Sequence, residues 1–263
     1  MSVYDADAHI EESPETFSDK YLDPAFRSNR PEVIAYGGRP HWVVDYQLFP
    51  RFRGPGAQSL GTPVRVDDIR SVYTQLKPEP IESLELSDPA ARLRDMDAEG
   101  IDLQVLYPDL FLTYPLSPDP VYAAGLCASY NRWLADATSS QRERLKWAAV
   151  VSLEDVGLAV QEVRRAQALG AVAIMVPGTA GDKLLGHPSL LPFFEEAASQ
   201  DLPIGVHVLW SSPALNGLVD DLYYSTLIPF VFPVLLGFIS IIGSGLLDKL
   251  PTLRVAFLEA GCL

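Results

Sequence analysis

Cysteine and basic residues are both scarce in this chain of 263 residues. The two cysteines, Cys127 and Cys262, are too few for the disulfide framework of a small secreted domain, so we expect a reducing, cytoplasmic setting. Only 20 Lys and Arg residues stand against 34 Asp and Glu residues, which gives a net charge of -14. A surface this acidic argues against nucleic acid or an anionic membrane as the main partner.

Long apolar runs are also absent, apart from residues 222–247, where 26 consecutive residues carry no charge. Length and hydropathy alone would favour a transmembrane helix there. Pro229, Pro233, Gly237 and Gly243 divide the run into shorter pieces, so we favour buried helices or an oligomer face over a membrane span. The N-terminus has no basic segment followed by an apolar one, so we predict no secretory signal.

From residue 88 onward the sequence repeats a pattern of a helix followed by a strand. Asp88 and Asp119, each followed by proline, are typical helix starts, and Gly100 and Gly170 mark helix ends. Repeated units of this kind imply a parallel sheet in an α/β fold. The predicted strands are 3–11, 103–107, 147–151, 171–176, 204–208 and 254–259.

Residues 13–87 show no sustained helical or strand period and contain nine prolines. Apolar and aromatic residues run through them, which favours an ordered, lid-like insertion in a single domain that spans 1–263. Its notable polar groups are Arg51, Arg53 and His41. They are candidates to bind an anionic substrate, although simple solvation at the surface accounts for each of them as well.

The stretch 3–11, VYDADAHIE, holds the densest group of ionisable side chains near the N-terminus. In a strand, side chains alternate, so Asp5, Asp7 and His9 would share one face. Such a face is expensive to bury unless a cation lies against it, and carboxylate with imidazole is a ligand set for a divalent metal. A solvated N-terminal tip is the alternative, and this stretch alone does not decide between the two.

Three predicted strands end in potential metal ligands: Asp7 and His9 end the first, His207 the fifth and Glu259 the sixth. Functional groups of parallel barrels and doubly wound sheets gather at the carboxyl ends of strands, so these four should converge. Singly, His207 is explained as a satisfied core histidine and Glu259 as a solvated strand end. Together, the four residues favour a metal site.

Two other residues of similar type lie near predicted strands. Asp109 follows the second predicted strand and is the one other carboxylate placed by the same rule. His187 precedes a proline in a loop, and we interpret it as structural.

Four segments resemble the amidohydrolase-related family, in the branch of aminocarboxymuconate-semialdehyde decarboxylase and the resorcylate and dihydroxybenzoate decarboxylases. They are DADAH at 5–9, RLRDMDAEGIDLQVL at 92–106, LPIGVH at 202–207 and LLDKLPTLRVAFLEAG at 246–261. The second and fourth are specific, and the resemblance covers nearly the whole chain. It implies a distorted TIM (β/α)8 barrel with one catalytic divalent metal, usually zinc and sometimes manganese.

The resemblance also implies the ligands. Asp7 and His9 occupy the family's H-x-H or E-x-H pair on the first strand, and His207 matches its histidine on the fifth. Glu259 stands where many members have a histidine on the sixth. A water activated by the metal would then support hydrolysis of a carbonyl-type bond, or loss of carbon dioxide from a small organic or aromatic acid.

The chain departs from the family at its C-terminal end. The resemblance implies further strands and a catalytic aspartate at the eighth strand, which would lie beyond Leu263, and six strands cannot close an eight-stranded barrel. We therefore predict a truncated member with little or no activity as written.

Three interpretations remain. The first is a metal-dependent hydrolase or non-oxidative decarboxylase with a small-molecule substrate, as a monomer or a homo-oligomer. The second is an inactive barrel fragment that serves as a structural or interaction protein. The third, a membrane-attached protein that uses residues 222–247, is less favoured than either.

Overall fold

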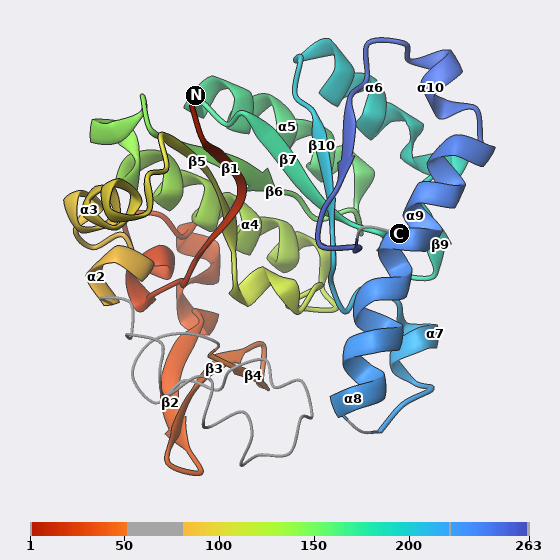
Figure 1. Cartoon of the computed structure of the whole chain (residues 1–263). Helices are drawn as coiled ribbons and strands as arrows, with labels where there is room; N and C mark the ends of the chain where they lie inside the picture. Colours follow the sequence, from red (N-terminus) through yellow and green to blue (C-terminus); the bar gives the residue numbers. More distant parts are fainter. Residues whose placement is uncertain (1, 52–80, 221, 262–263) are drawn as a thin grey trace.

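Six parallel strands form the central sheet of the computed structural model, which describes residues 2–51, 81–220 and 222–261 (Figure 1). Their order is β1-β5-β6-β7-β10-β11, and each neighbouring pair is parallel. The predicted parallel α/β sheet is confirmed. The strands are β1 Tyr4–Ile10, β5 Leu103–Pro108, β6 Leu145–Val150, β7 Ala173–Pro177, β10 Ile204–His207 and β11 Val255–Phe257.

The main helices begin and end where local sequence signals place them. The Asp88 carboxylate accepts the N–H of Ala90, and the Asp119 carboxylate accepts that of Val121, so each helix gains an N-cap. Gly100 has a φ of 74°, in the left-handed region that a helix C-terminus often needs and glycine tolerates. The helices are α3 Pro89–Glu99, α4 Pro120–Ala137, α5 Val156–Leu169 and α6 Leu191–Ser199.

Shorter elements lie in the connections between these strands and helices. They are η1 Pro14–Phe17, η2 Pro24–Asn29, α2 Ile81–Leu84, η3 Leu110–Leu112, η4 Ser139–Gln141, β8 Thr179–Ala180, β9 Lys183–Leu184, η5 Pro188–Leu190 and α7 Pro213–Asn216. Helices α4, α5 and α6 lie side by side along one face of the sheet (Figure 1). The sheet and its helices therefore form the two layers of an α/β wall.

The sheet curls until its two outer strands approach each other. Among the described residues, β1 pairs only with β5, and β11 only with β10. Yet Nε2 of His9, on β1, lies 4.0 Å from Oε1 of Glu259, just after β11. A flat sheet of six strands would hold its outer strands roughly 24 Å apart, five spacings of about 4.8 Å. The sheet is thus part of a barrel wall, as in the TIM-type fold.

A β-bulge interrupts β1 beside its carboxylates. Asp5 pairs with Gln104 and Ala8 with Leu106, so β1 advances by three residues where β5 advances by two. Such an extra residue bends the strand and redirects a side chain. Gln104 Nε2 donates to Asp5 Oδ2 at 3.0 Å, whereas Asp7 approaches His207. The bulge therefore gives Asp5 and Asp7 different partners, which strict alternation along a strand does not predict.

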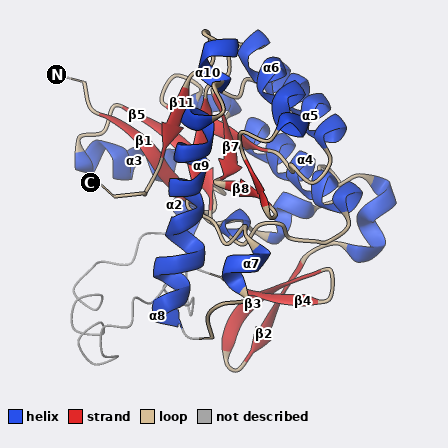
Figure 2. Ribbon diagram, turned by 90° about the vertical axis from the view of Figure 1, so that its right-hand side faces the viewer, coloured by secondary structure: helices blue, strands red, loops and turns tan. Residues whose placement is uncertain are grey.

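The insertion predicted at 13–87 contains regular structure that its sequence pattern did not reveal. Strands β2 Glu32–Tyr36, β3 Arg39–Val44 and β4 Gln47–Pro50 form an antiparallel sheet (Figure 2). Its two turns are Gly37–Gly38 and Asp45–Tyr46, where all four residues have positive φ, the geometry of tight hairpins. Each strand has only four to six residues, which is too short for a sustained period to be visible in the sequence.

Residues 13–51, the described N-terminal part of this insertion, pack against the central sheet. Trp42 on β3 is fully buried, and its ring meets that of Phe17 edge-on at 5.6 Å between centroids. Both side chains belong to the same hydrophobic core as β1 and β5. Residues 13–51 are therefore anchored to the barrel wall by burial of large aromatic groups.

The charge-free stretch is helical over most of its length. Its elements α8 Leu222–Ser225, the π-helical η6 Thr226–Val231 and α9 Phe232–Gly243 follow one another without a gap, and α10 Leu246–Lys249 begins after Gly245. Pro229 and Pro233 lie inside η6 and α9, so they coincide with changes of helix type and not with a break. Within the described parts of the chain, no helix has the length and apolar character needed to cross a bilayer. Helix α9 packs against β7, β8 and β10 (Figure 2). It buries Val234 and Ile241, while Phe238, Ile239 and Ile242 remain exposed.

Close packing of α9 against the sheet depends on Gly178, which precedes β8. A Cβ atom at this position would lie 2.0 Å from the carbonyl oxygen of Pro233 and 2.4 Å from the backbone nitrogen of Val234. Backbone atoms of a packed helix cannot turn aside as a side chain can. We expect Gly178→Ala to lower the free energy of unfolding by about 1–3 kcal/mol, measured by urea denaturation.

Gly243, the last residue of α9, provides the matched control, because a Cβ atom there would meet nothing within 4 Å. Gly243→Ala should be neutral, or stabilising by up to about 1 kcal/mol, since alanine favours the helix. Equal effects of the two substitutions would show that α9 does not depend on its approach to Gly178.

Candidate metal centre

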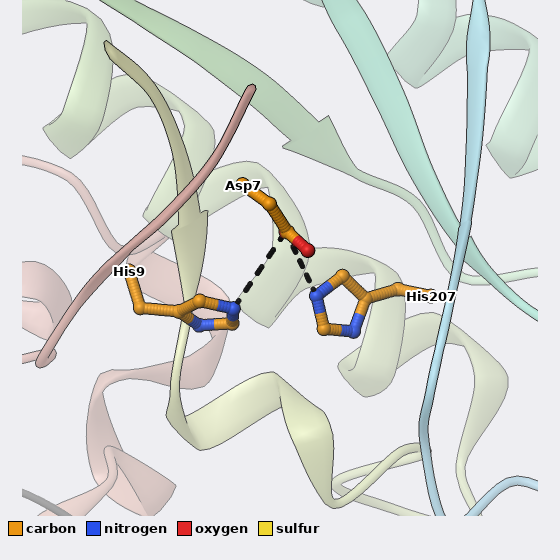
Figure 3. A group of neighbouring side chains, drawn as sticks. All are labelled: Asp7, His9 and His207. Atoms are coloured by element: carbon orange, nitrogen blue, oxygen red, sulfur yellow. Dashed lines mark hydrogen bonds and ion pairs between the residues drawn. The ribbon is translucent and has the colours of Figure 1, made fainter. Parts of the chain in front are cut away.

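Asp7, His9 and His207 converge at the carboxyl ends of β1 and β10 (Figure 3). The Asp7 Oδ1 atom lies 3.2 Å from Nε2 of His207 and 3.9 Å from Nε2 of His9. One potential ligand atom from each residue lies within 4.8 Å of the other two. Among the described residues, this is the one group of three such side chains close enough to share a metal ion. The convergence predicted from the strand ends is therefore present for these three residues.

Both ring nitrogens of His207 face oxygen atoms. Nδ1 lies 3.1 Å from the carbonyl oxygen of Val208, and Nε2 lies 3.2 Å from Asp7 Oδ1. A neutral imidazole has one N–H, so it donates to only one of these two oxygens. When Nδ1 donates to Val208, the lone pair of Nε2 faces the Asp7 carboxylate, which is the arrangement in which both side chains can bind one metal ion.

His9 repeats the pattern through its other neighbours. Its Nδ1 atom lies 3.1 Å from the carbonyl oxygen of Pro108 and 3.0 Å from Oδ1 of Asp109, so this nitrogen is the donor. Nε2 then presents its lone pair toward Asp7. The side chain is 7% exposed, and the ring lies 5.1 Å from that of His207 between centroids. The Nε2 atoms of both histidines therefore face the same carboxylate oxygen.

Asp109 contacts His9. The sequence pattern placed this carboxylate at the end of a strand, and we assigned no role to it. It follows β5 and is 2% exposed, and its carboxylate approaches the imidazole of a potential ligand from behind. Carboxylates in this position fix the orientation and tautomer of metal-binding histidines. Its position after a strand was the signal, but the neighbouring strand it would face was not predictable from the sequence.

Glu259 lies at the margin of the cluster. Its Oε1 atom is 4.0 Å from Nε2 of His9, and its side chain is 43% exposed. The residue follows β11 with a φ of 55°, a left-handed conformation that is uncommon outside glycine, asparagine and aspartate. The chain therefore turns sharply where the predicted strand 254–259 would have continued, and Glu259 lies outside the group of three ligands.

Tyr107 on β5 forms the floor next to both histidines. Its ring lies 5.5 Å from His207 and 6.3 Å from His9 between centroids. Burial, and then the negative charge of Asp7, raise the pKa of the Tyr107 phenol well above its ordinary value. The phenol therefore remains protonated and neutral throughout the physiological pH range.

Glu12 is a buried carboxyl group that the sequence interpretation overlooked. It is completely buried, and its Oε2 atom accepts the N–H groups of Asp109 at 3.2 Å and Leu110 at 2.8 Å. Burial raises the pKa of Glu12 to about 8; the bond from Leu110 lowers it, and the Asp109 charge raises it further. Glu12 is therefore largely protonated at neutral pH.

Two of the three predicted substrate-binding residues lie among the described residues, and each contacts a residue outside the cluster. Arg51 forms ion pairs with Glu11, at 3.1 Å, and with Glu85. His41 lies on β3, where its ring meets that of Tyr36 edge-on. Arg53 lies outside the described residues. The suggested roles of Arg51, Arg53 and His41 stay predictions.

A cavity of about 260 Å³ opens beside the cluster between β1 and α3. It is strongly acidic, because five carboxylates line it and the only guanidinium group among its described lining residues is that of Arg92. Those carboxylates belong to Asp5, Asp7, Asp95, Glu99 and Glu259. An anionic ligand in this cavity would meet repulsion unless a cation lay at the cluster.

A family model described as amidohydrolase matches residues 5–263 of this chain, which includes every residue of the cluster. The chain belongs to the amidohydrolase family. The sequence resemblance and the TIM-type fold are thus confirmed together.

Comparison with individual proteins agrees with this membership. A curated 2-amino-3-carboxymuconate-6-semialdehyde decarboxylase from Dictyostelium discoideum is 25% identical over 177 residues, which cover 66% of this chain and 48% of the relative. The chain therefore spans about half the length of the curated amidohydrolase-family relative that it matches.

Two solved structures of similar proteins share the fold. An amidohydrolase from Mycobacterium avium subsp. paratuberculosis K-10 superposes with a TM-score of 0.76 and 20% identity, over 99% of this chain and 72% of that one. The 5-carboxyvanillate decarboxylase of Novosphingobium aromaticivorans DSM 12444, in complex with manganese and 4-hydroxy-3-methoxy-5-nitrobenzoic acid, has a TM-score of 0.60 and 19% identity. That comparison covers 97% of this chain and 64% of the decarboxylase.

Proposed function

We propose that the chain carries the metal centre of a metal-dependent hydrolase or non-oxidative decarboxylase that acts on a small organic or aromatic acid. The observation that carries the proposal is the convergence of Asp7, His9 and His207 at the carboxyl ends of β1 and β10. The relatives support the substrate class, since one is a carboxymuconate-semialdehyde decarboxylase and another binds manganese with a nitrobenzoic acid.

The donor chemistry fits a divalent metal. We assign Oδ1 of Asp7 and the Nε2 atoms of His9 and His207 as ligands, with Glu259 as an additional carboxylate at the margin. Two imidazoles with carboxylate oxygen form a typical zinc site, and manganese accepts the same donors. We therefore propose one divalent metal per chain, with zinc as the first choice and manganese as the alternative.

When bound, the metal would supply Lewis acidity, which polarises a substrate oxygen and lowers the pKa of a water to about 7. The protein's own residues would orient this chemistry. Asp109 and the Pro108 carbonyl hold the donor nitrogen of His9, so its Nε2 atom faces the cluster. Tyr107 keeps its phenolic proton, so it adds no negative charge beside Asp7.

Substrate binding in this proposal depends on cations, because the cavity beside the cluster is acidic. Arg51 or Arg53 would hold a substrate carboxylate by a bidentate contact. Arg51 already pairs with Glu11 and Glu85, so binding substrate would exchange one carboxylate partner for another.

The test compares the protein after removal of metal by a chelator with the same protein reloaded with zinc or manganese. We expect aromatic carboxylates to bind the loaded form at least about tenfold more tightly, because the metal offsets the acidic cavity. Isothermal titration calorimetry measures this difference. Equal binding to loaded and stripped protein would contradict the proposed function.

The same mixtures, with lactones added to the panel, distinguish hydrolysis from decarboxylation by assay of carbon dioxide and of hydrolysed product. Release of carbon dioxide that depends on the added metal would support the decarboxylase, and metal-dependent release of a hydrolysed product would support the hydrolase.

The remaining parts of the proposal concern organisation and setting. We propose a single metal-dependent hydrolase domain over 1–263, in which 13–87 forms a lid-like insertion over the site. A cytoplasmic location, with zinc available to the site, fits the low cysteine content. Self-association through the apolar face of α9 is the form of homo-oligomer that we would test first.

A further inference from the structure

A line of buried polar groups leads away from the metal centre into the core of the barrel wall. It begins at Nδ1 of His9, which lies 3.0 Å from Oδ1 of Asp109. The backbone N–H of Asp109 is in turn bound by Oε2 of Glu12, at 3.2 Å, and the next N–H, of Leu110, by the same oxygen at 2.8 Å. Glu12 thus ties the loop after β1 to the turn that carries Asp109.

Tyr130 on α4 is the last buried polar group in this series. Its hydroxyl group and Oε1 of Glu12 are both buried and have no hydrogen-bond partner among the residues that the structure describes. Burial raises the pKa of the Tyr130 phenol well above its ordinary value, and the charges of Glu12 and Asp109 raise it further. A second negative charge beside Asp109 would be costly in this enclosed place, so a neutral Glu12 is the compatible state.

We propose that Glu12 is a positioning residue for the metal centre: through the backbone of Asp109 and Leu110 it fixes the Asp109 carboxylate against Nδ1 of His9. With Nδ1 held as the donor, Nε2 keeps its lone pair directed at the cluster. The inference rests on the proposed function in that His9 is a metal ligand. It assigns to Glu12 a role that acts entirely through Asp109.

An ordinary structural role for Glu12 is the competing explanation, since its carboxyl group also satisfies two buried N–H groups. The two roles differ in what they predict for substitutions. A glutamine retains the acceptor oxygen and the neutral state, whereas an alanine removes the acceptor. A structural role would lower stability without a specific effect on His9, while a positioning role changes His9 itself.

The experiment measures the dissociation constant for zinc by competition with a chromophoric chelator. We expect Glu12→Ala to weaken binding about 10- to 100-fold, the usual effect of losing a group that orients a ligand, and Glu12→Gln to bind as the unmodified protein does. Glu162→Ala is the matched control, because Glu162 is a buried carboxyl on α5 bound by Asn131. It should leave the zinc affinity unchanged.

A double-mutant cycle with Asp109→Asn shows whether Glu12 acts through Asp109. We expect the double variant to bind zinc no more weakly than the weaker of the two single variants. Additive losses, or an unchanged affinity in Glu12→Ala, would overturn the inference. If Glu12→Ala does not fold, Glu12→Asp takes its place, because the shorter side chain cannot reach both N–H groups, and an unchanged affinity would overturn the inference equally.

A second readout needs no metal. The ¹⁵N chemical shifts of the His9 ring in metal-free protein report which nitrogen carries the hydrogen. We expect the Nδ1–H form in the unmodified protein and in Glu12→Gln, and a smaller share of it in Glu12→Ala. Absence of zinc binding by the unmodified protein would overturn the proposed function, whereas identical ring shifts in all three proteins would overturn the positioning role.

Discussion

Replacing His207 by alanine is expected to weaken the binding of a divalent metal by roughly 10²–10³-fold. A structural zinc site contributes about 10–16 kcal/mol in all, so one of four ligands accounts for roughly 3 kcal/mol or more. His207 is completely buried, and its Nε2 atom lies 3.2 Å from Asp7, so no water or neighbouring side chain takes its place easily. Elemental analysis of the purified protein should find about one zinc or manganese per chain, and almost none in His207→Ala.

His187→Ala provides the control for this experiment. His187 is exposed, and its Nδ1 atom accepts the N–H of Ser189 at the start of η5, which agrees with the structural role inferred from the sequence. Its removal should leave the metal content at one per chain. Loss of metal in both variants would indicate a general folding defect, and retention in both would contradict the assignment of His207 as a ligand.

The second large effect concerns pH, and it is expected in Glu12→Gln. The Glu12 pKa is raised from an ordinary value of 4.5 to about 8 in the folded protein. Below pH 4.5 the group is protonated in both folded and unfolded chains, and its contribution to stability is complete. Between pH 4.5 and 8 the unfolded chain releases the proton and the folded protein retains it, so folding becomes less favourable by about 1.4 kcal/mol per pH unit.

Glutamine cannot release a proton, so Glu12→Gln should escape this loss. Its free energy of unfolding, from urea denaturation at a series of pH values, should equal that of the unmodified protein near pH 4.5. At pH 8 the free energy of unfolding of Glu12→Gln should exceed that of the unmodified protein by roughly 3–5 kcal/mol. Glu196 gives the opposite control, because Arg164 lowers its pKa and Glu196→Gln should be the less stable protein at neutral pH. A difference independent of pH would show that Glu12 is already ionised in the folded protein.

The helices were the part of the fold most open to prediction from sequence. Their boundaries depend on contacts between residues two to five positions apart, such as Asp88 with Ala90 and Gly100 with Met96. Pro229 lies within the π-helical η6 and Pro233 in the first turn of α9, so these prolines accompany a change of helix type and leave no gap in the helical stretch. Asp7 and His9 were singled out by the alternation of ionisable side chains in residues 3–11, and His207 by its place at the end of a predicted strand.

The antiparallel sheet of 32–50 was missed because four to six residues give too short a period to recognise. Gly37–Gly38 was an available signal for a hairpin, since two adjacent glycines favour the turn. The second turn, Asp45–Tyr46, has no glycine, and its positive φ values are set by the strands that it joins. In this segment tertiary packing around Trp42 decides the structure.

The surroundings of the metal centre were also beyond the sequence. His9 meets Asp109, and Glu12 meets Leu110, across the pairing of β1 with β5. Which residues face each other there depends on the register of that pairing, and the bulge between Asp5 and Ala8 shifts it by one residue. The convergence of Asp7, His9 and His207 was therefore predictable from the sequence, whereas the groups that contact them required the structure.

The contact between Asp7 and His207 joins residues 200 positions apart in the chain. Closing a loop of that length carries an entropic cost that only a completed sheet repays, so contacts of this kind form late in folding. During synthesis, Asp7 on β1 cannot contact His207 on β10 until nearly the whole of the described barrel wall has left the ribosome. A metal ion bound as we propose would therefore be captured only after the first and fifth strands of the wall are both in place.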